Sequence, residues 1–460
     1  MVEKLPDVPF DIGEMYSGNI PIDYNNTKNT LFFVHYPSIT GPVDEVTVWL
    51  NGGPGCSSLE GFFQENGPFL WLPGTLAPVQ NPYSWVNLTN MLWVEQPIGT
   101  GFATGTPTAT TQEDIAAQFL GFFRNFQDMF DIENYKIYVT GESYAGRYVP
   151  YISAAMLDQK DKTHCDLTGA LIYDPCIGEF ASVQQEYVAV PFVQKNNNIL
   201  NLNDTFTAEL ENLHNTCGYQ AYLDKYLTFP PSGVQPALFF NYTAAGACNV
   251  FDLINVALFD VAPCFDIYNI VEIQCPLLSD VMGFPTQLTT NQYDQVYFNR
   301  SDVKQAMHAP RTIDWQECAP SVFPLGKGGP QDEGDLSADP IQYVLPQVIE
   351  IISNGDLDMI IITNGTLLAI QNMTWHNRLG FQTQPSTPIN ITMPGLQYQA
   401  VFAANGLQGY NGPQEIIGVQ HHERGPMWAQ TYGAGHMQPE FQPRVAYRHL
   451  EWLLNRTQVL

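Results

Sequence analysis

Two hydrophobic patterns alternate along this chain. Short runs of β-branched and aromatic residues that end in Gly, Pro or Asp predict strands leading into loops. Longer stretches between them, notably residues 111–130 and 146–157, predict helices. Strands that alternate with helices indicate a mainly parallel sheet covered by helices on both faces. The predicted strands cover residues 30–36, 46–50, 91–95, 135–140, 169–173, 349–353 and 427–432.

The alternation fails between about residues 180 and 320. This region is rich in Asn, Pro and aromatic residues and holds four of the eight cysteines. We expect residues 181–320 to form an insertion that caps the carboxyl-terminal edge of the sheet, with residues 1–180 and 321–460 forming the core. Two more helices are predicted, at 363–377 and at 445–454, the second one amphipathic.

Composition narrows the possible partners. The chain has 46 Asp and Glu against 18 Lys and Arg, a net charge of −28. Such a field repels polyanions, so we expect no binding to nucleic acid or to an anionic membrane. The charge suits the solubility of a secreted protein, and it also suits attraction of basic peptides, although charge alone does not establish the latter.

No segment is predicted to cross a membrane. The most apolar stretch, 349–370, is interrupted by Glu350, Asn354 and Asp356, so we interpret it as a core strand followed by a helix. The first residues lack the apolar run of a signal peptide, and we therefore expect none in this sequence.

Cysteines and glycosylation signals favour an oxidising compartment. The cysteines are even in number, and no C-x-x-C pair is present, so a zinc site is not expected. Each N-x-S/T signal accepts a glycan only on the secretory route. The candidate asparagines are Asn25, Asn87, Asn203, Asn241, Asn299, Asn364, Asn372, Asn390 and Asn455.

The run from Val139 to Gly146 carries the strongest chemical signal. A β-branched strand enters a tight turn of small residues with Ser143 at its apex, as in a nucleophile elbow. Serine becomes a good nucleophile when a histidine accepts its proton and an acid orients that histidine. Asp358 and His436 follow in that order. The competing interpretation is that Ser143 only caps a helix.

A second motif opposes that interpretation. The run V-W-L-N-G-G-P-G-C-S-S at 48–58 places glycines directly after a predicted strand. Glycine lets the backbone come close to a bound group and direct its N–H donors at it. A loop of this kind supplies half of the oxyanion hole in α/β-hydrolases.

With these motifs the sequence resembles the serine carboxypeptidases, and most closely the fungal secreted ones. The resemblance covers nearly the whole chain. One departure is Ala145, which stands where the G-x-S-x-G pattern has its second glycine, and the family's own pattern allows it. The resemblance rests on residues 49–58, 141–146, 354–358, 423–425 and 433–439.

This resemblance implies an α/β-hydrolase fold with a mostly helical cap. It implies a secreted or vacuolar enzyme that releases single residues from peptide or protein C-termini through an acyl-enzyme, without a metal or organic cofactor. It also implies a disulfide between Cys56 and Cys318. For the clustered cysteines we favour the nested pairs Cys217–Cys275 and Cys248–Cys264. Cys165 and Cys176, which flank a strand, are left either paired with each other or free.

The roles in catalysis follow from motif and resemblance together. Ser143 is the expected nucleophile and His436 the expected base, whereas His421 and His422 lack metal-ligand spacing and are interpreted as surface or packing residues. Spacing alone leaves three candidates for the acid, namely Asp358, Asp356 and Asp174, and the resemblance selects Asp358. The oxyanion hole is expected from the backbone N–H groups of Gly53 and Tyr144.

Exopeptidase activity also needs groups that hold a terminal carboxylate. By resemblance these are Asn51, Glu65 and Glu142, assisted by the N–H of Gly52. Two glutamates can hold an anion only if they retain a proton, which close contact between like charges favours.

Two rival functions remain open from the sequence. Acyltransferases and hydroxynitrile lyases share these motifs, but the retained carboxylate-binding residues favour the peptidase. The other rival is a catalytically inactive glycoprotein with a binding role, which the complete triad disfavours.

Overall fold

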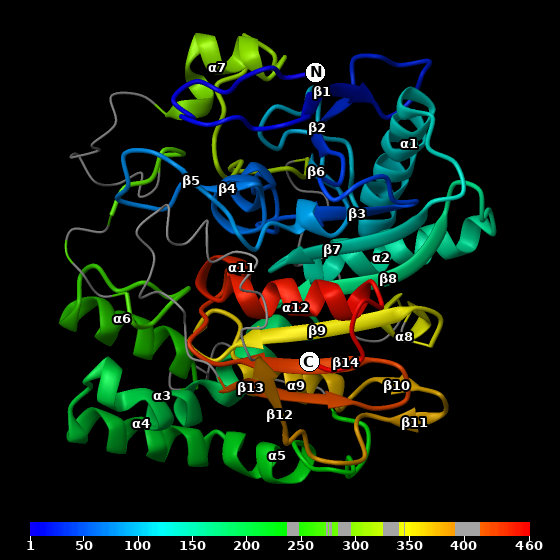
Figure 1. Ribbon diagram of the computed structural model, residues 1–460. Coiled ribbons are helices and arrows are strands. Elements are labelled where there is room, and N and C mark those ends of the chain that lie inside the picture. Colours follow the sequence, from blue (N-terminus) through cyan, green and yellow to red (C-terminus); the bar gives the residue numbers. More distant parts are fainter. Residues whose placement is uncertain are drawn as a thin grey trace.

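The computed structural model describes residues 1–236, 248–272, 275, 278–283, 296–324, 340–344, 346–391 and 415–460. One large sheet organises these residues, in the order β1-β2-β6-β3-β7-β8-β9-β14-β13-β12 (Figure 1). Its strands are β1 (Tyr16–Pro21), β2 (Thr30–Tyr36), β3 (Glu45–Leu50), β6 (Asn90–Glu95), β7 (Lys136–Glu142), β8 (Asp166–Tyr173), β9 (Ile349–Gly355), β12 (Thr387–Ile391), β13 (Glu415–His422) and β14 (Met427–Thr431).

The centre of the sheet is parallel, as the alternating pattern predicts. Strands β6, β3, β7, β8, β9 and β14 run parallel to one another. The predicted strands all fall in this sheet, whereas β1, β12 and β13 are absent from the prediction. These three lie at the antiparallel edges. Gly and Pro within β1 and β12, and polar residues along β13, weaken the strand signal there, as is typical of edge strands.

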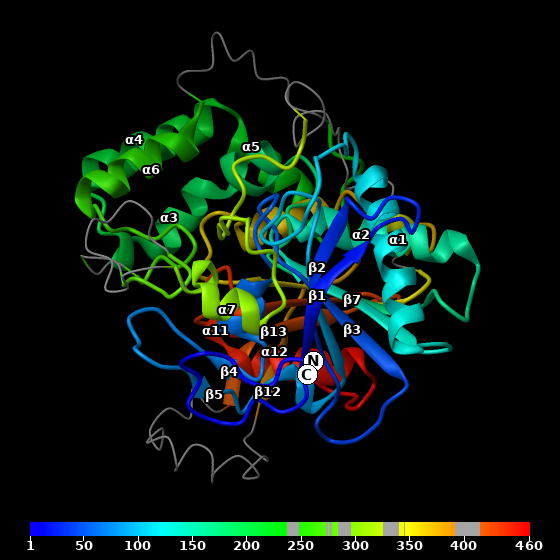
Figure 2. The same ribbon diagram turned by 90° about the horizontal axis from the view of Figure 1, so that it is seen from above.

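Helices cover both faces of the sheet (Figures 1 and 2). On one face α1 (Gln112–Phe130) and α2 (Ala145–Gln159) pack on alternate residues of β3, β7 and β8. The helix α9 (Thr363–Ile370) covers the same face near β9 and β14. On the opposite face α12 (Pro443–Leu453) packs in a cluster with Leu171, Ile351 and Met427, which are paired across β8, β9 and β14. Because successive side chains of a strand point to opposite faces, the apolar clusters on the two faces of the sheet are separate.

A group of helices lies beside this sheet, within the predicted insertion (Figure 2). It comprises α3 (Tyr187–Leu200), α4 (Asp204–Thr216), α5 (Tyr219–Tyr226) and α6 (Val250–Val261), which share one core with α9. The remaining elements are short: α7 (Ser301–Ala306), α8 (Pro340–Val344), α11 (Gln438–Phe441), β4 (Phe69–Leu70), β5 (Val79–Gln80), β10 (Thr374–Trp375), β11 (Arg378–Leu379), the π-helices η1 (Gly61–Glu65) and η3 (Phe180–Glu186), and the 3₁₀ turns η2 (Trp85–Asn87) and η5 (Tyr297–Asn299).

The nested disulfide pairing predicted for the insertion is wrong. Cys217 pairs with Cys248, and Cys264 pairs with Cys275. Cys217 caps the end of α4 and Cys248 precedes α6, and because these two helices contact each other, the ends that carry the cysteines meet. A third disulfide joins Cys56 to Cys318. Neither Cys165 nor Cys176 belongs to a disulfide in the described part of the chain.

The helix predicted at 363–377 is too long. It ends at Ile370, and the chain then forms the hairpin β10–β11. His376 and Asn377 join the two strands with φ values of 45° and 60°. Positive φ at both central residues is the signature of a type I′ turn, which ends any helix. The predicted strand at 349–353 is confirmed and extends to Gly355.

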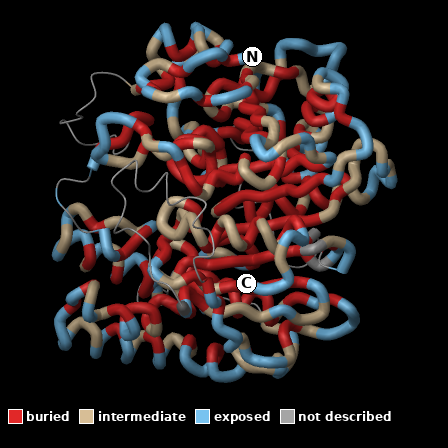
Figure 3. The backbone as a smooth tube through the Cα atoms, in the orientation of Figure 1, coloured by how far each residue is buried: buried red, intermediate tan, exposed pale blue. Residues whose placement is uncertain are grey.

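Burial follows the sheet. The strands and the inner helix faces are buried, and exposure is concentrated in loops and outer helix faces (Figure 3). Among the described residues, no helix is both long enough and apolar enough to cross a membrane.

The cysteine pairing is directly testable. Proteolysis under non-reducing, acidic conditions should release one cross-linked peptide pair containing Cys217 and Cys248, and another containing Cys264 and Cys275. The contact between α4 and α6 described above explains the link between Cys217 and Cys248. The link between Cys264 and Cys275 joins two neighbouring positions after α6. Mass spectrometry with and without reduction gives the measurement. Recovery of Cys217 linked to Cys275 would restore the nested pairing and contradict the structure.

Candidate active site

Ser143 sits on a strained turn between β7 and α2. Its backbone has a φ of 62°, a left-handed conformation that is uncommon for residues other than glycine. The turn is held from three sides: the Ser143 N–H donates to the Tyr173 carbonyl at 2.9 Å, and the Ser143 carbonyl accepts from the N–H groups of Gly146 and Cys176. A hydroxyl held in this way projects from the end of the sheet, as a nucleophile elbow requires.

The elbow needs small residues because other backbone crosses it closely. A Cβ on Gly141 would lie 2.3 Å from the Leu50 carbonyl oxygen. A Cβ on Gly52 would lie 2.4 Å from the Tyr144 nitrogen and 2.7 Å from the Ser143 Cβ. The loop after β3 therefore passes directly against the residue that follows Ser143. This contact brings the two backbone groups expected to form the oxyanion hole, at Gly53 and Tyr144, to the same place.

A buried carboxyl group that belongs to no recognised sequence motif supports the loop after β3. Glu95, at the end of β6, accepts hydrogen bonds from the Ser57 hydroxyl, from the Trp315 indole at 3.0 Å and from the Phe102 N–H at 2.6 Å. Burial raises the pKa of Glu95 to about 7. The loop is also tied to a distant segment by the Cys56–Cys318 disulfide and by the Ser57 N–H, which donates to the Glu317 carbonyl at 2.7 Å.

His436 and Asp358 form a buried pair. The Nδ1–H of His436 donates to Asp358 Oδ2 at 2.7 Å, and Asp358 Oδ1 accepts from the N–H groups of Ile360 and Ile361. The bond on Nδ1 fixes the tautomer that leaves Nε2 as the acceptor. Nε2 is buried and has no hydrogen-bond partner among the described residues, and His436 lines the same pocket as Ser143.

The two other acid candidates do not contact the imidazole in this way. Asp356 accepts from the Gly433 N–H at 2.7 Å. Asp174 accepts from the Gly355 N–H and from the Gln438 amide, with a ligand atom within 4.8 Å of Asp358 and His436. Burial, together with the nearby Asp358, raises the pKa of Asp174 well above its ordinary value. Because two such acids cannot easily both be charged, Asp174 is placed as a neutral neighbour of Asp358.

The four residues expected to bind a carboxylate lie together beside Ser143. The orientation of the Asn51 amide is fixed because its oxygen accepts from the Trp49 indole at 2.8 Å and from the Gly61 N–H at 3.2 Å. Its nitrogen therefore points at the acids, donating to Glu142 at 2.8 Å and to Glu65 at 3.2 Å. Gly52 follows directly and lines the pocket.

Both glutamates are almost fully buried, and each has one oxygen without a partner among the described residues. Burial raises the pKa of Glu65 to about 7, although hydrogen bonds from Glu142 and Asn51 lower it in part. Burial and the nearby charges of Glu65 and Glu60 raise the pKa of Glu142 well above its ordinary value. Since the two acids are in contact, they hold at least one proton between them in acid solution.

These groups open into one cavity of about 590 Å³. It contains Ser143, His436, Glu142, Gly52 and Gly53, and it is also lined by apolar side chains such as Leu72, Val271 and Phe441. Several acidic residues that line it were missed by the sequence analysis. They come from separate segments and share no motif.

Known proteins resemble this chain along nearly its whole length. A family model described as serine carboxypeptidase matches residues 6–456. Serine-type carboxypeptidase F of Aspergillus niger is 60% identical, over 100% of this chain and 87% of its own length. A probable serine carboxypeptidase of Arthroderma benhamiae is 44% identical, over 98% of this chain and 85% of its own length.

A solved structure supports the fold. The prohormone-processing carboxypeptidase Kex1Δp of Saccharomyces cerevisiae superposes with a TM-score of 0.75 over 100% of this chain and 95% of that chain, at 23% identity. This likeness agrees with the α/β-hydrolase fold that the order of the motifs predicts. From the family match along almost its entire length, and from relatives this similar, the chain belongs to the serine carboxypeptidase family.

Proposed function

We propose that this serine carboxypeptidase works through Ser143, His436 and Asp358. The observation that carries the proposal is the cavity that Ser143, His436 and Glu142 line together. The imidazole of His436 is oriented by Asp358, and its Nε2 has no partner among the described residues. Ser143 Oγ attacks the last peptide carbonyl while His436 Nε2 accepts its proton, and the C–N bond then breaks as that proton passes to the leaving amine. A water molecule then attacks the acyl carbon while His436 Nε2 accepts its proton. The bond to Ser143 Oγ breaks as that proton passes to Ser143, which releases the shortened peptide.

The oxyanion of each tetrahedral intermediate is assigned to the N–H groups of Gly53 and Tyr144. The close crossing of the loop and the elbow supports this assignment, because it fixes both backbones before substrate arrives. Donors that are already oriented stabilise developing charge without reorganisation, and one such donor typically lowers the activation barrier by about 3–4 kcal/mol.

Release of single residues is assigned to the group formed by Asn51, Glu65 and Glu142 with the Gly52 N–H. Each acid has one oxygen without a partner in the described part of the chain, and when that oxygen is protonated it can donate to the terminal carboxylate of a substrate. Protonated Glu142 donates a hydrogen bond, and the Asn51 amide donates another in exchange for its longer bond to Glu65. An internal peptide bond has no carboxylate for this group, so the substrates are peptide or protein C-termini.

The same group makes activity favour acid. The pair holds at least one proton until the pH exceeds the raised pKa values of both glutamates. Loss of that proton places a carboxylate against a carboxylate, so KM increases. At the other end, a general base must be neutral to accept the proton of Ser143, so kcat falls in strong acid. The ratio kcat/KM is therefore highest between these limits.

A secreted or vacuolar location is proposed as well. Three disulfides support it, and so do exposed asparagines in glycosylation signals at positions 25, 203, 364, 390 and 455. Asn299 is a poorer acceptor because its amide pairs with the Trp315 backbone in both directions. Asn87 and Asn372 are partly buried, and Asn241 lies outside the described residues.

Replacing the nucleophile should remove peptidase and esterase activity together. Ser143→Ala eliminates the acyl-enzyme through which both reactions pass, and kcat should fall on the order of a million-fold. The measurement is hydrolysis of one blocked dipeptide and of its methyl ester-linked analogue. Peptidase activity above about a thousandth of wild type would identify another nucleophile.

A pair of matched variants tests the identity of the acid. Asp358→Asn leaves the imidazole in the wrong tautomer, and kcat should fall by about 10⁴-fold. Asp174→Asn replaces a neutral acid with a neutral amide of the same shape, so kcat should fall far less. Circular dichroism and thermal melting provide the check that both variants fold. Equal losses in the two variants would contradict the assignment of the acid to Asp358.

The third test measures KM against pH for a blocked dipeptide and for its C-terminal amide. In the wild type, KM for the free acid should rise toward neutral pH, whereas KM for the amide should stay flat. Glu142→Gln keeps a permanent donor beside Ser143, so it should flatten the rise for the free acid. If KM climbs equally steeply in the variant, Glu142 does not bind the substrate carboxylate.

A further inference from the structure

A second cavity lies at the opposite end of the central strands from Ser143. It measures about 530 Å³, within the range of roughly 300–1,000 Å³ that is usual for small-molecule sites, and it shares no lining residue with the cavity of Ser143. Its walls come from the starts of central strands: Thr168 lies near the start of β8, Val348 directly precedes β9, and Gly425 stands just before β14. We call it the distal cavity.

The chain that follows α12 forms one wall of the distal cavity. Trp452 in the last turn of α12, and then Asn455 and Thr457, line it. This stretch of chain is held in place, because Arg456 between them forms an ion pair with Glu45 on β3. The wall is therefore a fixed part of the structure.

Two residues of this wall belong to one glycosylation signal. In Asn455-Arg456-Thr457 a glycan is accepted by Asn455 Nδ2. Asn455 is exposed, its Oδ1 accepts from the Gln458 amide at 2.6 Å, and its Nδ2 makes no hydrogen bond to the described parts of the chain. The acceptor nitrogen is thus available, and it belongs to a residue that lines a cavity.

The polar groups of the distal cavity suit a neutral ligand. None of its described lining residues is Asp, Glu, Lys or Arg, although the chain carries a net charge of −28. His376 Nδ1 donates to the Arg424 carbonyl and His422 Nε2 donates to the Gly425 carbonyl, both at 3.0 Å. In the neutral imidazoles these bonds leave the other ring nitrogen as an acceptor. The cavity therefore offers acceptors to hydroxyl groups without offering a charge.

A flat apolar face completes the distal cavity. The Trp452 indole is half-buried and meets the His422 ring edge to face, with ring centroids 5.5 Å apart. The Gln347 amide donates to the Tyr343 carbonyl at 2.7 Å, which leaves the amide oxygen as a further acceptor. A sugar ring has hydroxyl groups at its edge and C–H groups on its faces. An indole face beside planar amide and imidazole acceptors matches both.

From these observations we propose that the distal cavity holds the first N-acetylglucosamine of a glycan attached to Asn455. The inference goes beyond the catalytic function and rests on the proposed secretory route. In that route Asn455 Nδ2 loses a proton and bonds to the anomeric carbon of the sugar, as the bond from this carbon to a lipid diphosphate breaks. The sugar then packs on Trp452 and donates to the free acceptors of Gln347 and His422.

Attachment to the wall makes modest contacts sufficient. A ligand that is tethered at its own site has a high effective concentration there, so it stays bound although the free sugar binds weakly. The bound sugar links the chain after α12 to the turn between β13 (Glu415–His422) and β14, and to the segment before β9. The glycan at Asn455 should therefore be less accessible than other glycans, and it should stabilise the fold.

Release of the glycan tests its accessibility. We would secrete the enzyme from a yeast host and treat the native protein with an amidase that cleaves the bond between asparagine and sugar, which converts each occupied Asn to Asp. Peptide mass spectrometry then gives the rate at each site. Release at Asn455 should be about tenfold slower, or more, than at Asn25 and Asn203, because cleavage requires the sugar to leave the cavity. Prior unfolding should abolish the difference.

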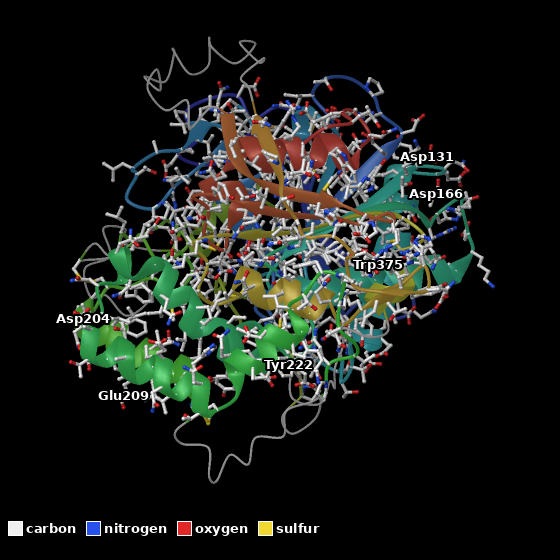
Figure 4. All side chains as sticks on the ribbon, turned by 90° about the horizontal axis from the view of Figure 1, so that it is seen from below. Asp131, Asp166, Asp204, Glu209, Tyr222 and Trp375 are labelled. Atoms are coloured by element: carbon white, nitrogen blue, oxygen red, sulfur yellow. A yellow bond between two sulfur atoms is a disulfide. The ribbon has the colours of Figure 1, made fainter. Side chains whose placement is uncertain are left out.

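The two comparison sites are exposed and remote from the distal cavity. Asn203 directly precedes Asp204 of α4, which lies on the other side of the molecule from Asp166 at the start of β8 (Figure 4). The matched variant is Trp452→Leu, which removes the flat face but keeps an apolar side chain. It should raise the rate at Asn455 to that of the comparison sites and leave their rates unchanged.

Thermal melting gives a second readout. Thr457→Ala removes the glycosylation signal, whereas Thr457→Ser keeps the signal and the hydroxyl, which donates to the Val459 carbonyl. Thr457→Ala should lower Tm by about 1–2 °C, and Thr457→Ser should not. On the Trp452→Leu background the difference between the two variants should shrink to the contribution of the hydroxyl. Thr27→Ala, which removes the signal at Asn25, is the control and should leave Tm unchanged.

The outcomes separate this proposal from the proposed function. Asn455 without a glycan, or with a glycan released as fast as those at Asn25 and Asn203, overturns it, whereas the catalytic mechanism is unaffected. If no asparagine carries sugar, the secretory location fails as well. Ligand-observed NMR with diacetylchitobiose identifies the source of the sugar. Binding to Thr457→Ala but not to the glycosylated wild type supports occupancy by the chain's own glycan, and equal binding to both overturns it.

Discussion

The active site depends on the approach of two backbone turns. The loop that leaves β3 and the elbow that leaves β7 come so close that a single carbon atom on residue 52 would overlap the nitrogen of Tyr144. Adjacent parallel strands bring the two turns to the same edge, and the disulfide from Cys56 and the buried Glu95 hold the loop in place. The proposed oxyanion site, the proposed nucleophile Ser143 and the amide of Asn51 all lie at this contact.

A second constraint is electrostatic. The site buries several carboxyl groups that the protein does not neutralise with cations among the described residues. Glu65 and Glu142 share one polar contact through Asn51, and Asp174 lies behind Asp358. Buried acids in contact tend to stay protonated, because a neutral carboxyl group costs less free energy in a low-dielectric interior than two unpaired negative charges. Acid solution is therefore the condition in which this arrangement is least strained.

The sequence predicted the parallel centre of the sheet and the residues of its loops, because strand endings and glycine-rich turns are local signals. It did not predict β12 and β13, which pair with each other at one edge of the sheet. It also did not predict the hairpin after Ile370, which depends on the positive φ values of His376 and Asn377. The paired cysteines of the insertion depended on contact between α4 and α6, which no spacing rule reveals. For the same reason neither Glu95 nor the acids that line the cavity could be predicted, because each resembles an ordinary surface acid until distant segments meet around it.

The cavity divides its residues between two kinds of scaffold. Ser143 and the Asp358–His436 pair follow the ends of central strands, where neighbouring strands on both sides fix the backbone. Other acids that line the cavity, namely Glu60, Asp280, Glu317 and Glu440, lie instead on short segments outside the large sheet. Side-chain contacts and one disulfide hold these segments. Substitutions in those segments can alter which substrates the cavity accepts. They do not disturb the hydrogen bonds between the central strands that position Ser143, Asp358 and His436. Substitutions in these segments thus offer relatives of this chain a way to change their substrate preference while they keep the same reaction.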